Sequence, residues 1–474
     1  MRGPGAEPLA GLGRAQRGVG QSPTVLTLGL KEEKMKKIFM VVVVLAFVAC
    51  GGAETVPMGA EPVAGAAGNE GAVAGPPERE AVTIDFWHAL TGVHFDAVQA
   101  TVDAFHAAQD YVRVEHIFQG NPTQLNQLVM ASAMAGTLPH LGNPQIVQIS
   151  QYIENNFIHS LNPFIEDAER GLSQAELDDI VGIFTDMNMW GDQRFSVPFG
   201  KSTRVLFYNQ EMFANAGLQP PTTWAEVREF AEILTTENTV GFGFENAWGA
   251  EFQALQAQHG GVHIDEVARQ ARFAEAPGLA AMNWIAELVL SPYGRLAGED
   301  GFMSGVFGSG GVAMYIGSSA GIPHVAGAMQ PGMTWGTAPT PTLDGFQAVQ
   351  FAGPDAVMFI NPNHSDAETW GAWEFLRFTL EPEITAQFAI NSGYIPVRYS
   401  ALELPFFVEY LSENPTYRAA TEQFENGFFP PRLTESAEIG SILSEQQELI
   451  LLGMAEVEAA MQYAQDRANE ILGN

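Results

Sequence analysis

The stretch VTIDFWHALTGVHFDAVQATVDAFHAAQDYVRVEHIF, residues 82–118, decides the fold class. Its first residues are rich in β-branched and aromatic side chains, which predict a strand over 82–87. Apolar residues then recur at helical spacing and predict a helix over 95–108. Residues 112–118 alternate and predict a second strand, and 124–135 have the helical pattern again. This strand–helix–strand–helix order predicts a parallel sheet with right-handed crossovers.

The rest of the chain continues the alternation of strands and helices. Extended segments are expected at 195–199, 205–208 and 312–316, and helices at 223–234, 367–380 and over most of 436–472. Thr223 is the expected N-cap of its helix, because Glu226 stands at the spacing of a capping box. These elements predict two α/β lobes, with ligand bound in a cleft at the carboxyl ends of the strands.

Composition and charge exclude several classes of protein. Hydrophobic residues make up 46% of the 474 residues, so a sizeable core is expected. Seven of the 22 basic and three of the 55 acidic residues precede residue 51, which leaves 15 basic and 52 acidic residues, a net charge of −37. Such a surface repels nucleic acid and anionic membrane, and nucleic acid is not an expected partner.

The segment around Cys50 has the plan of an export signal. Lys36 and Lys37 precede an apolar run over 38–48, and small Ala49 stands before the cysteine. Residues 35–49 are therefore expected to be a signal peptide. Residues 47–50, FVAC, resemble a bacterial lipobox, which predicts that Cys50 is acylated and holds the protein at the cell envelope. An ordinary signal peptide with an unrelated cysteine is the alternative.

The segments on either side of this signal have other compositions. Residues 1–34 are rich in Gly and Arg and are expected to lie before the natural start at Met35. Residues 50–80 hold Gly, Ala, Pro and Glu with few large apolar groups, so a flexible tether behind the anchor is expected. Cys50 is the sole cysteine, which rules out a disulfide within the chain.

Several motifs in order resemble those of family 1 extracellular solute-binding proteins of ABC importers, in particular members that bind glycerol 3-phosphate or sugars. The resemblance covers residues 82–474. The segments that carry it are FWH at 86–88, FQGN at 118–121, VPFGKST at 197–203, LFYN at 206–209, AGL at 216–218, PTTW at 221–224, GVAM at 311–314 and SGYIPV at 392–397.

This resemblance implies a two-lobed periplasmic-binding-protein fold of type II with a hinged cleft. The N-terminal lobe is expected to comprise residues 81–202 and 353–400, and the C-terminal lobe residues 203–352 and 401–474. The implied function is capture of a sugar, polyol or polyol phosphate for a membrane permease that works with a separate ATPase. The protein is expected to be a monomer without a cofactor and not an enzyme.

The resemblance also implies ligand-binding positions. They are Ser202, Trp224, Ser318, Gly353 and Tyr394. The chemistry of sugar sites, which use aromatic faces and hydroxyl partners, adds His88, Asn121 and Trp248. Three positions of the glycerol-3-phosphate proteins are replaced, at Pro122 and near Ile146 and Gly440. These replacements favour a neutral sugar or another polyol derivative over glycerol 3-phosphate.

Lys201 is the only lysine after Cys50. If its side chain faces the cleft, it is a candidate ligand for a phosphate or carboxylate and would replace the lost arginine of the family. The alternatives are that it points outward or remains by chance on a surface poor in lysine.

A secreted serine hydrolase is the alternative function. Residues 317–321, GSSAG, match the nucleophile-elbow pattern with Ser319 at the centre and a strand before it. Asp344 or Asp355 with His364 would complete a triad in this chain order, and HGG at 259–261 resembles an oxyanion-hole motif. No metal site is expected, because glycines separate His259 from His263.

Overall fold

The computed structural model describes residues 80–298 and 301–473. The signal peptide, the lipidation of Cys50 and nearly all of the tether are predictions that lie outside these residues. Within the described ranges, no helix has the length and apolar character needed to cross a membrane.

The first sheet is built on the N-terminal stretch. Its order is β2 (Val112–Phe118), β1 (Val82–His88), β3 (Leu141–Gly142), β15 (Asp355–Met358) and β6 (Val197–Pro198). β1 is parallel to β2 and β3, with Val82 opposite Val112 and His88 opposite Phe118. The predicted parallel pairing is confirmed. β15 enters antiparallel from much later in the chain.

Helices cover both faces of the first sheet. Ile84 and Phe86 pack in one core with α1 (Val93–Ala108) and α13 (Asp366–Thr379). Val357 packs in a second core with α2 (Pro122–Ala135) and α3 (Ile146–Glu154). The sequence predicted α1, α2 and α13 to within two residues at each end.

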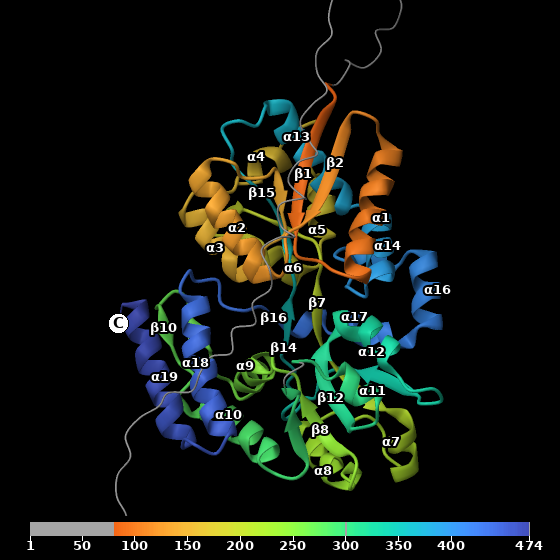
Figure 1. Ribbon diagram of the computed structural model, residues 1–474, viewed down its shortest axis with the longest axis vertical. Helices are drawn as coiled ribbons and strands as arrows, with labels where there is room; N and C mark the ends of the chain where they lie inside the picture. Colours follow the sequence, from red (N-terminus) through yellow and green to blue (C-terminus); the bar gives the residue numbers. More distant parts are fainter. Residues whose placement is uncertain (1–79, 299–300, 474) are drawn as a thin grey trace, which may run out of the picture. The chain divides into compact units, whose positions relative to one another are not determined.

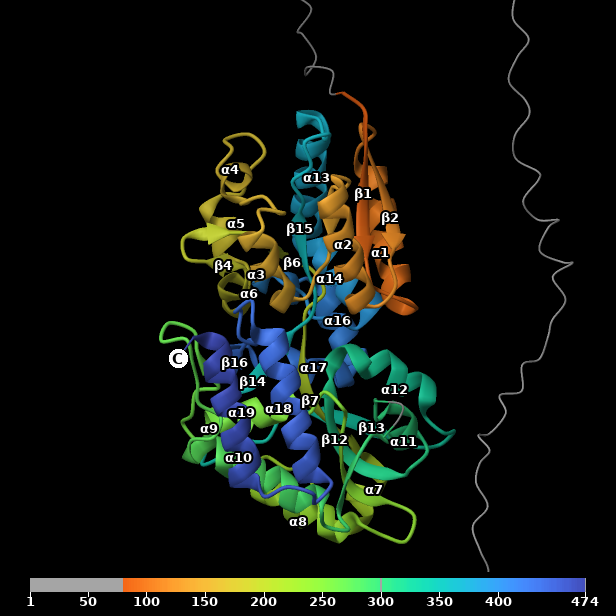
Figure 2. The ribbon, with the colours of Figure 1, turned by 60° about the vertical axis from the view of Figure 1, so that its left-hand side comes forward.

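The second sheet has the order β11 (Gly294–Leu296), β8 (Val240–Phe244), β12 (Val312–Ser318), β7 (Ser202–Asn209), β14 (Val349–Ala352) and β16 (Gly427–Phe428), and β13 (Trp335–Ala338) pairs with β7. One face packs against helices α8 (Trp224–Leu234), α9 (Gly249–Gln258), α10 (Ala276–Val289), α18 (Ser436–Leu451) and α19 (Val457–Leu472). Figures 1 and 2 show α18 and α19 side by side next to α10. The predicted capping box of α8 is confirmed. The helical segment predicted over 436–472 is two helices, with Gly453 in the left-handed region between them.

The remaining elements connect these layers. They are α4 (Asn162–Ile165), α5 (Gln174–Asp178), α6 (Gly182–Met187), β4 (Met189–Trp190), β5 (Gln193–Arg194), α7 (Gln210–Ala216), β9 (Ile264–Asp265), β10 (Gln270–Ala271), α11 (Ser304–Gly308), η3 (Ser319–Gly321), α12 (Ile322–Ala328), α14 (Pro382–Ser392), α15 (Tyr399–Leu402), α16 (Pro405–Glu413), η4 (Pro415–Tyr417), α17 (Arg418–Thr421) and η5 (Phe424–Asn426).

Two neighbouring chain segments join the sheets. β6 leads into β7 through Gly200 and Lys201, and β14 leads into β15 through Gly353. Gly353 has φ 110°, and a Cβ there would lie 2.0 Å from the carbonyl oxygen of Gly200. Only glycine fits this close approach of the two crossing segments.

Candidate functional site

A cavity of about 310 Å³ lies where strand ends of the second sheet meet α1 of the first. β8 ends one residue before Glu245, and β12 ends at Ser318. From the first sheet, β1 leads through a short turn into α1, which carries His94 in its first turn. The lining residues are His94, Glu245, Phe302, Ser304, Tyr315, Ser318, Ala320, Gly321 and His324. Carboxyl ends of strands are where α/β sheets bind small molecules.

His94 of α1 contacts residues from distant parts of the chain at this cavity. Its ring centroid lies 5.8 Å from that of His324 in α12 and 4.8 Å from that of Tyr394. Burial and the nearby His324 lower the pKa of His94, so its imidazole is neutral at pH 7. Its Nε2 is buried and has no hydrogen-bond partner in the described part of the chain. A buried polar atom of this kind favours a ligand or water that supplies the missing bond.

Charged side chains stand directly behind the cavity wall. Arg204 of β7 contacts Glu251 from Nε at 2.5 Å and Glu245 from Nη1 at 3.3 Å. Its Nη2 donates to the carbonyl oxygen of Ile316 at 3.3 Å. Arg204 is 9% exposed and the two carboxylates less, so the group is almost closed to bulk water. Glu245 is the member that lines the cavity.

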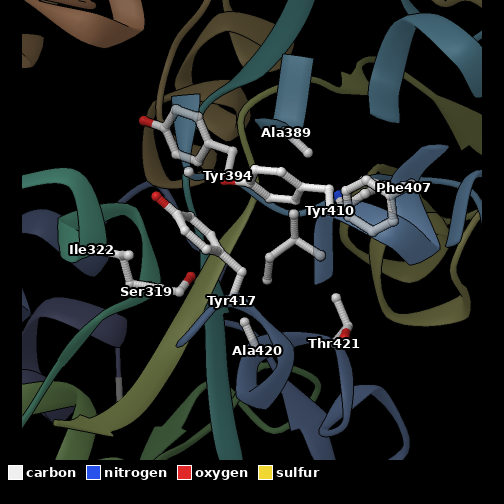
Figure 3. Close-up of a pocket in the computed structure, with 12 residues that line it drawn as sticks. Ser319, Ile322, Ala389, Tyr394, Phe407, Tyr410, Tyr417, Ala420 and Thr421 are labelled. Atoms are coloured by element: carbon white, nitrogen blue, oxygen red, sulfur yellow. The ribbon is translucent and has the colours of Figure 1, made fainter. Parts of the chain in front are cut away.

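A much smaller cavity lies next to the first, between α14, α16, η3 and α12. Its volume of about 10 Å³ admits one water molecule at most, so no sugar fits there. Figure 3 shows the rings of Tyr394, Tyr410 and Tyr417 around it, with Ser319 and Ile322 on another side. Burial raises the pKa of Tyr394, so its phenol stays protonated.

Two predicted ligand residues lie at or beside the larger cavity. Ser318 lines it, and its hydroxyl accepts from the N–H of Ala320 at 3.3 Å. Tyr394 lines the smaller cavity and contacts the His94 ring that lines the larger one.

Lys201, Ser202 and Gly353 meet at the crossing segments. Lys201 is fully buried, with Nζ 2.5 Å from Oδ1 of Asp355 and 3.3 Å from the carbonyl oxygen of Gly353. Ser202 is 8% exposed and pairs with Ala352 across β7 and β14. None of the three is among the residues that line the 310 Å³ cavity. The Lys201 side chain is neither outward nor at this cavity; it is half of an ion pair.

The other predicted residues have structural partners. Nε2 of His88 lies 3.0 Å from Nδ1 of His116. Asn121 caps α2, accepting from the N–H of Gln124 at 3.0 Å. Trp224 is 2% exposed, and its Nε1 donates to Gln258 at 2.7 Å. Trp248 is 8% exposed in the core of the second sheet. Their roles in ligand binding stay predictions.

The predicted nucleophile elbow has other contacts. Ser319 is 1% exposed, and its Oγ accepts from the N–H of Thr203 at 3.2 Å. His364 stacks on His140 at 3.7 Å between ring centroids, and Asp355 is paired with Lys201. No described hydrogen bond joins Ser319 to a histidine, so the geometry gives the hydrolase prediction no support.

Sequence reasoning missed most of the cavity wall. His94, Glu245, Phe302, Tyr315 and His324 were not predicted to bind ligand. One signal was available: Glu245 is a carboxylate directly after an apolar strand, at its carboxyl end.

Comparison with known proteins agrees with this architecture. The profile of a family described as bacterial extracellular solute-binding protein matches residues 100–417. The sn-glycerol-3-phosphate-binding periplasmic protein UgpB of Agrobacterium fabrum is 24% identical over 417 residues, covering 82% of this chain and 92% of the relative. Its counterpart in Rhizobium meliloti is 25% identical, with 82% and 93% covered.

Solved structures share the fold. The cyclic alpha-maltosyl-1,6-maltose binding protein of Arthrobacter globiformis has a TM-score of 0.71 at 25% identity, covering 83% of this chain and 99% of the other. UgpB of Mycobacterium tuberculosis, solved with glycerophosphocholine, has a TM-score of 0.72 at 21% identity with the same coverage. The fold is therefore the predicted two-lobed α/β fold of periplasmic binding proteins.

Proposed function

We propose that this chain, which belongs to the family of bacterial extracellular solute-binding proteins, captures a small polar solute and delivers it to the membrane permease of an ABC importer. The solute class is a sugar or polyol derivative, as in the names of the relatives. The ATPase would be a separate chain, and the binding protein itself would work as a monomer without a cofactor.

The observation that carries this proposal is the 310 Å³ cavity lined by strand ends of the second sheet and by His94 of α1, which packs on the first sheet. Its volume is at the low end for small-molecule sites. Serine hydroxyls, imidazoles and a carboxylate lie beside the aromatic rings of Tyr315 and Phe302, a combination suited to sugar hydroxyls and C–H faces. A solute that contacts both His94 and the second sheet stabilises the arrangement in which the two sheets are close, which is the form a permease would recognise.

The cavity wall favours a solute without a phosphate. No lysine or arginine is among its lining residues, and Arg204 and Lys201 are already paired with buried carboxylates. Of the predicted ligand residues, we propose that Ser318 contacts the solute directly and that Tyr394 positions His94.

We also propose the route to the cell envelope and the lobe boundaries that the sequence predicts. Export by the segment 35–49 and acylation of Cys50 would place the protein outside the cytoplasmic membrane. The lobes would comprise 81–202 with 353–400, and 203–352 with 401–474.

A ligand panel tests the function. The melting temperature of the purified protein is measured with neutral monosaccharides, disaccharides, polyols and polyol phosphates. A solute at 100 times its Kd is expected to add about 2.7 kcal/mol of stability, visible as a shift of several degrees. Calorimetric titration then gives the affinity, and Ser318→Ala is expected to weaken it. The absence of any shift or heat across the panel would contradict the proposal.

A further inference from the structure

Glu245 is the one acidic residue among the side chains that line the 310 Å³ cavity, and no basic residue other than histidine lines it. The residue is 7% exposed, so its charge is screened weakly by water. No lysine or arginine lines the cavity beside it; its one described cationic partner, Arg204, stands behind the wall and is shared with Glu251.

Arg204 does not fully occupy this carboxylate. Its shortest contact, 2.5 Å from Nε, goes to Glu251, and only the longer 3.3 Å contact from Nη1 reaches Oε2 of Glu245. No hydrogen bond to Oε1 of Glu245 occurs among the described residues, and Oε1 is not among the buried atoms without a partner. This oxygen is open to a donor from the cavity.

The lack of a side chain at Gly317 leaves room for this oxygen. A Cβ at Gly317 would lie 3.2 Å from Oε1 of Glu245 and 2.6 Å from the ring of Tyr315. The absence of a side chain at Gly317 thus lets the carboxylate and the aromatic ring approach the same point of β12.

Two aromatic rings line the same cavity as the carboxylate. Tyr315 is 1% exposed and stacks on Phe207 with 4.6 Å between ring centroids, so its ring is held firmly. Phe302 also lines the cavity, and 67% of its surface is exposed. A carboxylate among aromatic rings is a typical environment for an organic cation, because both attract positive charge.

We propose that the solute is a sugar-sized polyhydroxy compound with a protonated amine, and that Oε1 of Glu245 binds this amine. The inference rests on the proposed function and names the substrate class of the same cavity. Ser304, Ser318 and the neutral His94 remain for the hydroxyl groups.

Calorimetric titration of the full chain with matched sugars tests this inference at pH 7.0. The probes are glucosamine, galactosamine and mannosamine, each against its parent hexose, its N-acetyl derivative and its 6-phosphate. At least one amine is expected to bind tenfold or more tightly than its parent and its N-acetyl form. In Glu245→Gln, the ratio of amine to parent affinity is expected to fall toward one.

Two further variants separate a local contact from general charge and folding effects. Glu229→Gln removes the same charge from an exposed position on α8 and is expected to keep the amine preference. Gly317→Ala retains Glu245 but crowds both Oε1 and the Tyr315 ring beside it, and it is expected to reduce the preference. If Glu245→Gln does not fold, the ratios of amine to parent affinity in the wild type and in Gly317→Ala still test the inference.

The outcomes distinguish the inference from the function beneath it. Parent hexoses or phosphates that bind as tightly as the amines would overturn the amine class and leave the solute-binding function intact. An amine preference unchanged in both Glu245→Gln and Gly317→Ala would overturn the role of Glu245. Binding of no solute, charged or neutral, would overturn both proposals.

Discussion

Lys201 shows how a single side chain acquires its role from distant parts of the chain. Its ammonium group is buried 2.5 Å from Oδ1 of Asp355, and Asn188 donates to the same oxygen at 2.8 Å. Lys201→Met removes the cation and leaves the carboxylate buried without its counter-ion. We expect the free energy of unfolding to fall by about 3–5 kcal/mol, measured by urea denaturation.

The double variant Lys201→Met/Asp355→Asn is the matched control, because it leaves no buried charge at this position. It is expected to be more stable than Lys201→Met alone. A Lys201→Met protein that keeps full stability but loses affinity for an anionic solute would contradict the ion-pair role. Such a result would support the anion site that the sequence alone allowed.

His88 belongs to a chain of hydrogen bonds that determines which ring nitrogen carries the proton in two imidazoles. The N–H of Leu90 donates to Nδ1 of His88 at 3.3 Å, so Nε2 of His88 carries the proton that faces Nδ1 of His116. Nε2 of His116 in turn lies 2.8 Å from Oε1 of Gln99. A further proton on His88 would disrupt this chain. Burial and the neighbouring His116 lower the pKa of His88 to about 4.

Stability is therefore expected to depend on pH through His88. In the unfolded chain its pKa is near 6.5, so between pH 6.5 and 4 the unfolded state binds a proton that the folded state does not. The stabilisation is complete above pH 6.5 and falls as the pH drops toward 4, by roughly 3 kcal/mol in all. Urea denaturation at pH 7.5, 6.0 and 5.0 measures this slope.

His88→Gln keeps polar atoms at this position but does not titrate in this window, so its slope is expected to be shallower. His259→Gln, at an exposed position, is the comparison variant and is expected to keep the wild-type slope. Equal slopes in wild type and His88→Gln would show that this histidine does not carry the effect.

The segment after β16 contacts elements of the first sheet's body. Nη1 of Arg432 donates to the carbonyl oxygens of Asp186, at 2.9 Å, and of Met189. Its guanidinium carbon lies 5.2 Å from the centroid of Trp190. Close by, Thr434 donates to Glu154 of α3 at 2.5 Å. α18 follows directly and packs in the second sheet's core, so this segment holds the two bodies together.

Arg432→Ala is expected to loosen this connection. The radius of gyration of the solute-free protein, measured by small-angle X-ray scattering, should increase, and the free energy of unfolding should fall by about 1–3 kcal/mol through the lost charged hydrogen bonds. Arg418→Ala removes an exposed arginine with no described ion pair and should change neither quantity. Unchanged scattering in Arg432→Ala would contradict the connecting role.

Elements with a strong local pattern were predicted well from the sequence. β2 has its predicted bounds, Val112–Phe118, because alternation of apolar and polar residues fixes a strand within its own length. β3, by contrast, is two residues long and is defined by β1 and β15 on either side. Its partner Val357 lies more than two hundred residues later, so no local pattern indicates it.

The same distinction separates the cavity-lining residues that were predicted from those that were missed. Ser318, which lines the cavity, was predicted because it comes at the end of a recognisable strand in a family motif. The place of Glu245 beside the cavity depends on Arg204 of β7, and that of His94 on His324 of α12. The sequence singled out Lys201 by its rarity, but its direction depends on Asp355, which enters the sheet 154 positions later.

The net charge of −33 acts on the whole molecule. Carboxylates that repel one another across the surface destabilise the compact state, and dissolved salt screens this repulsion. Raising NaCl from 0.02 M to 0.5 M shortens the Debye length from about 21 Å to about 4 Å. The buried pairs of Lys201 and Arg204 are largely shielded from the salt, so the lost repulsion outweighs the lost attraction.

We expect the melting temperature at pH 7.5 to rise by several degrees when the salt concentration is raised in this way, measured by calorimetry. At pH 4.5, where many carboxylates are protonated, the rise should be smaller. A melting temperature that falls with salt at pH 7.5 would mean that attractive surface pairs, rather than repulsion, dominate the electrostatics of this protein.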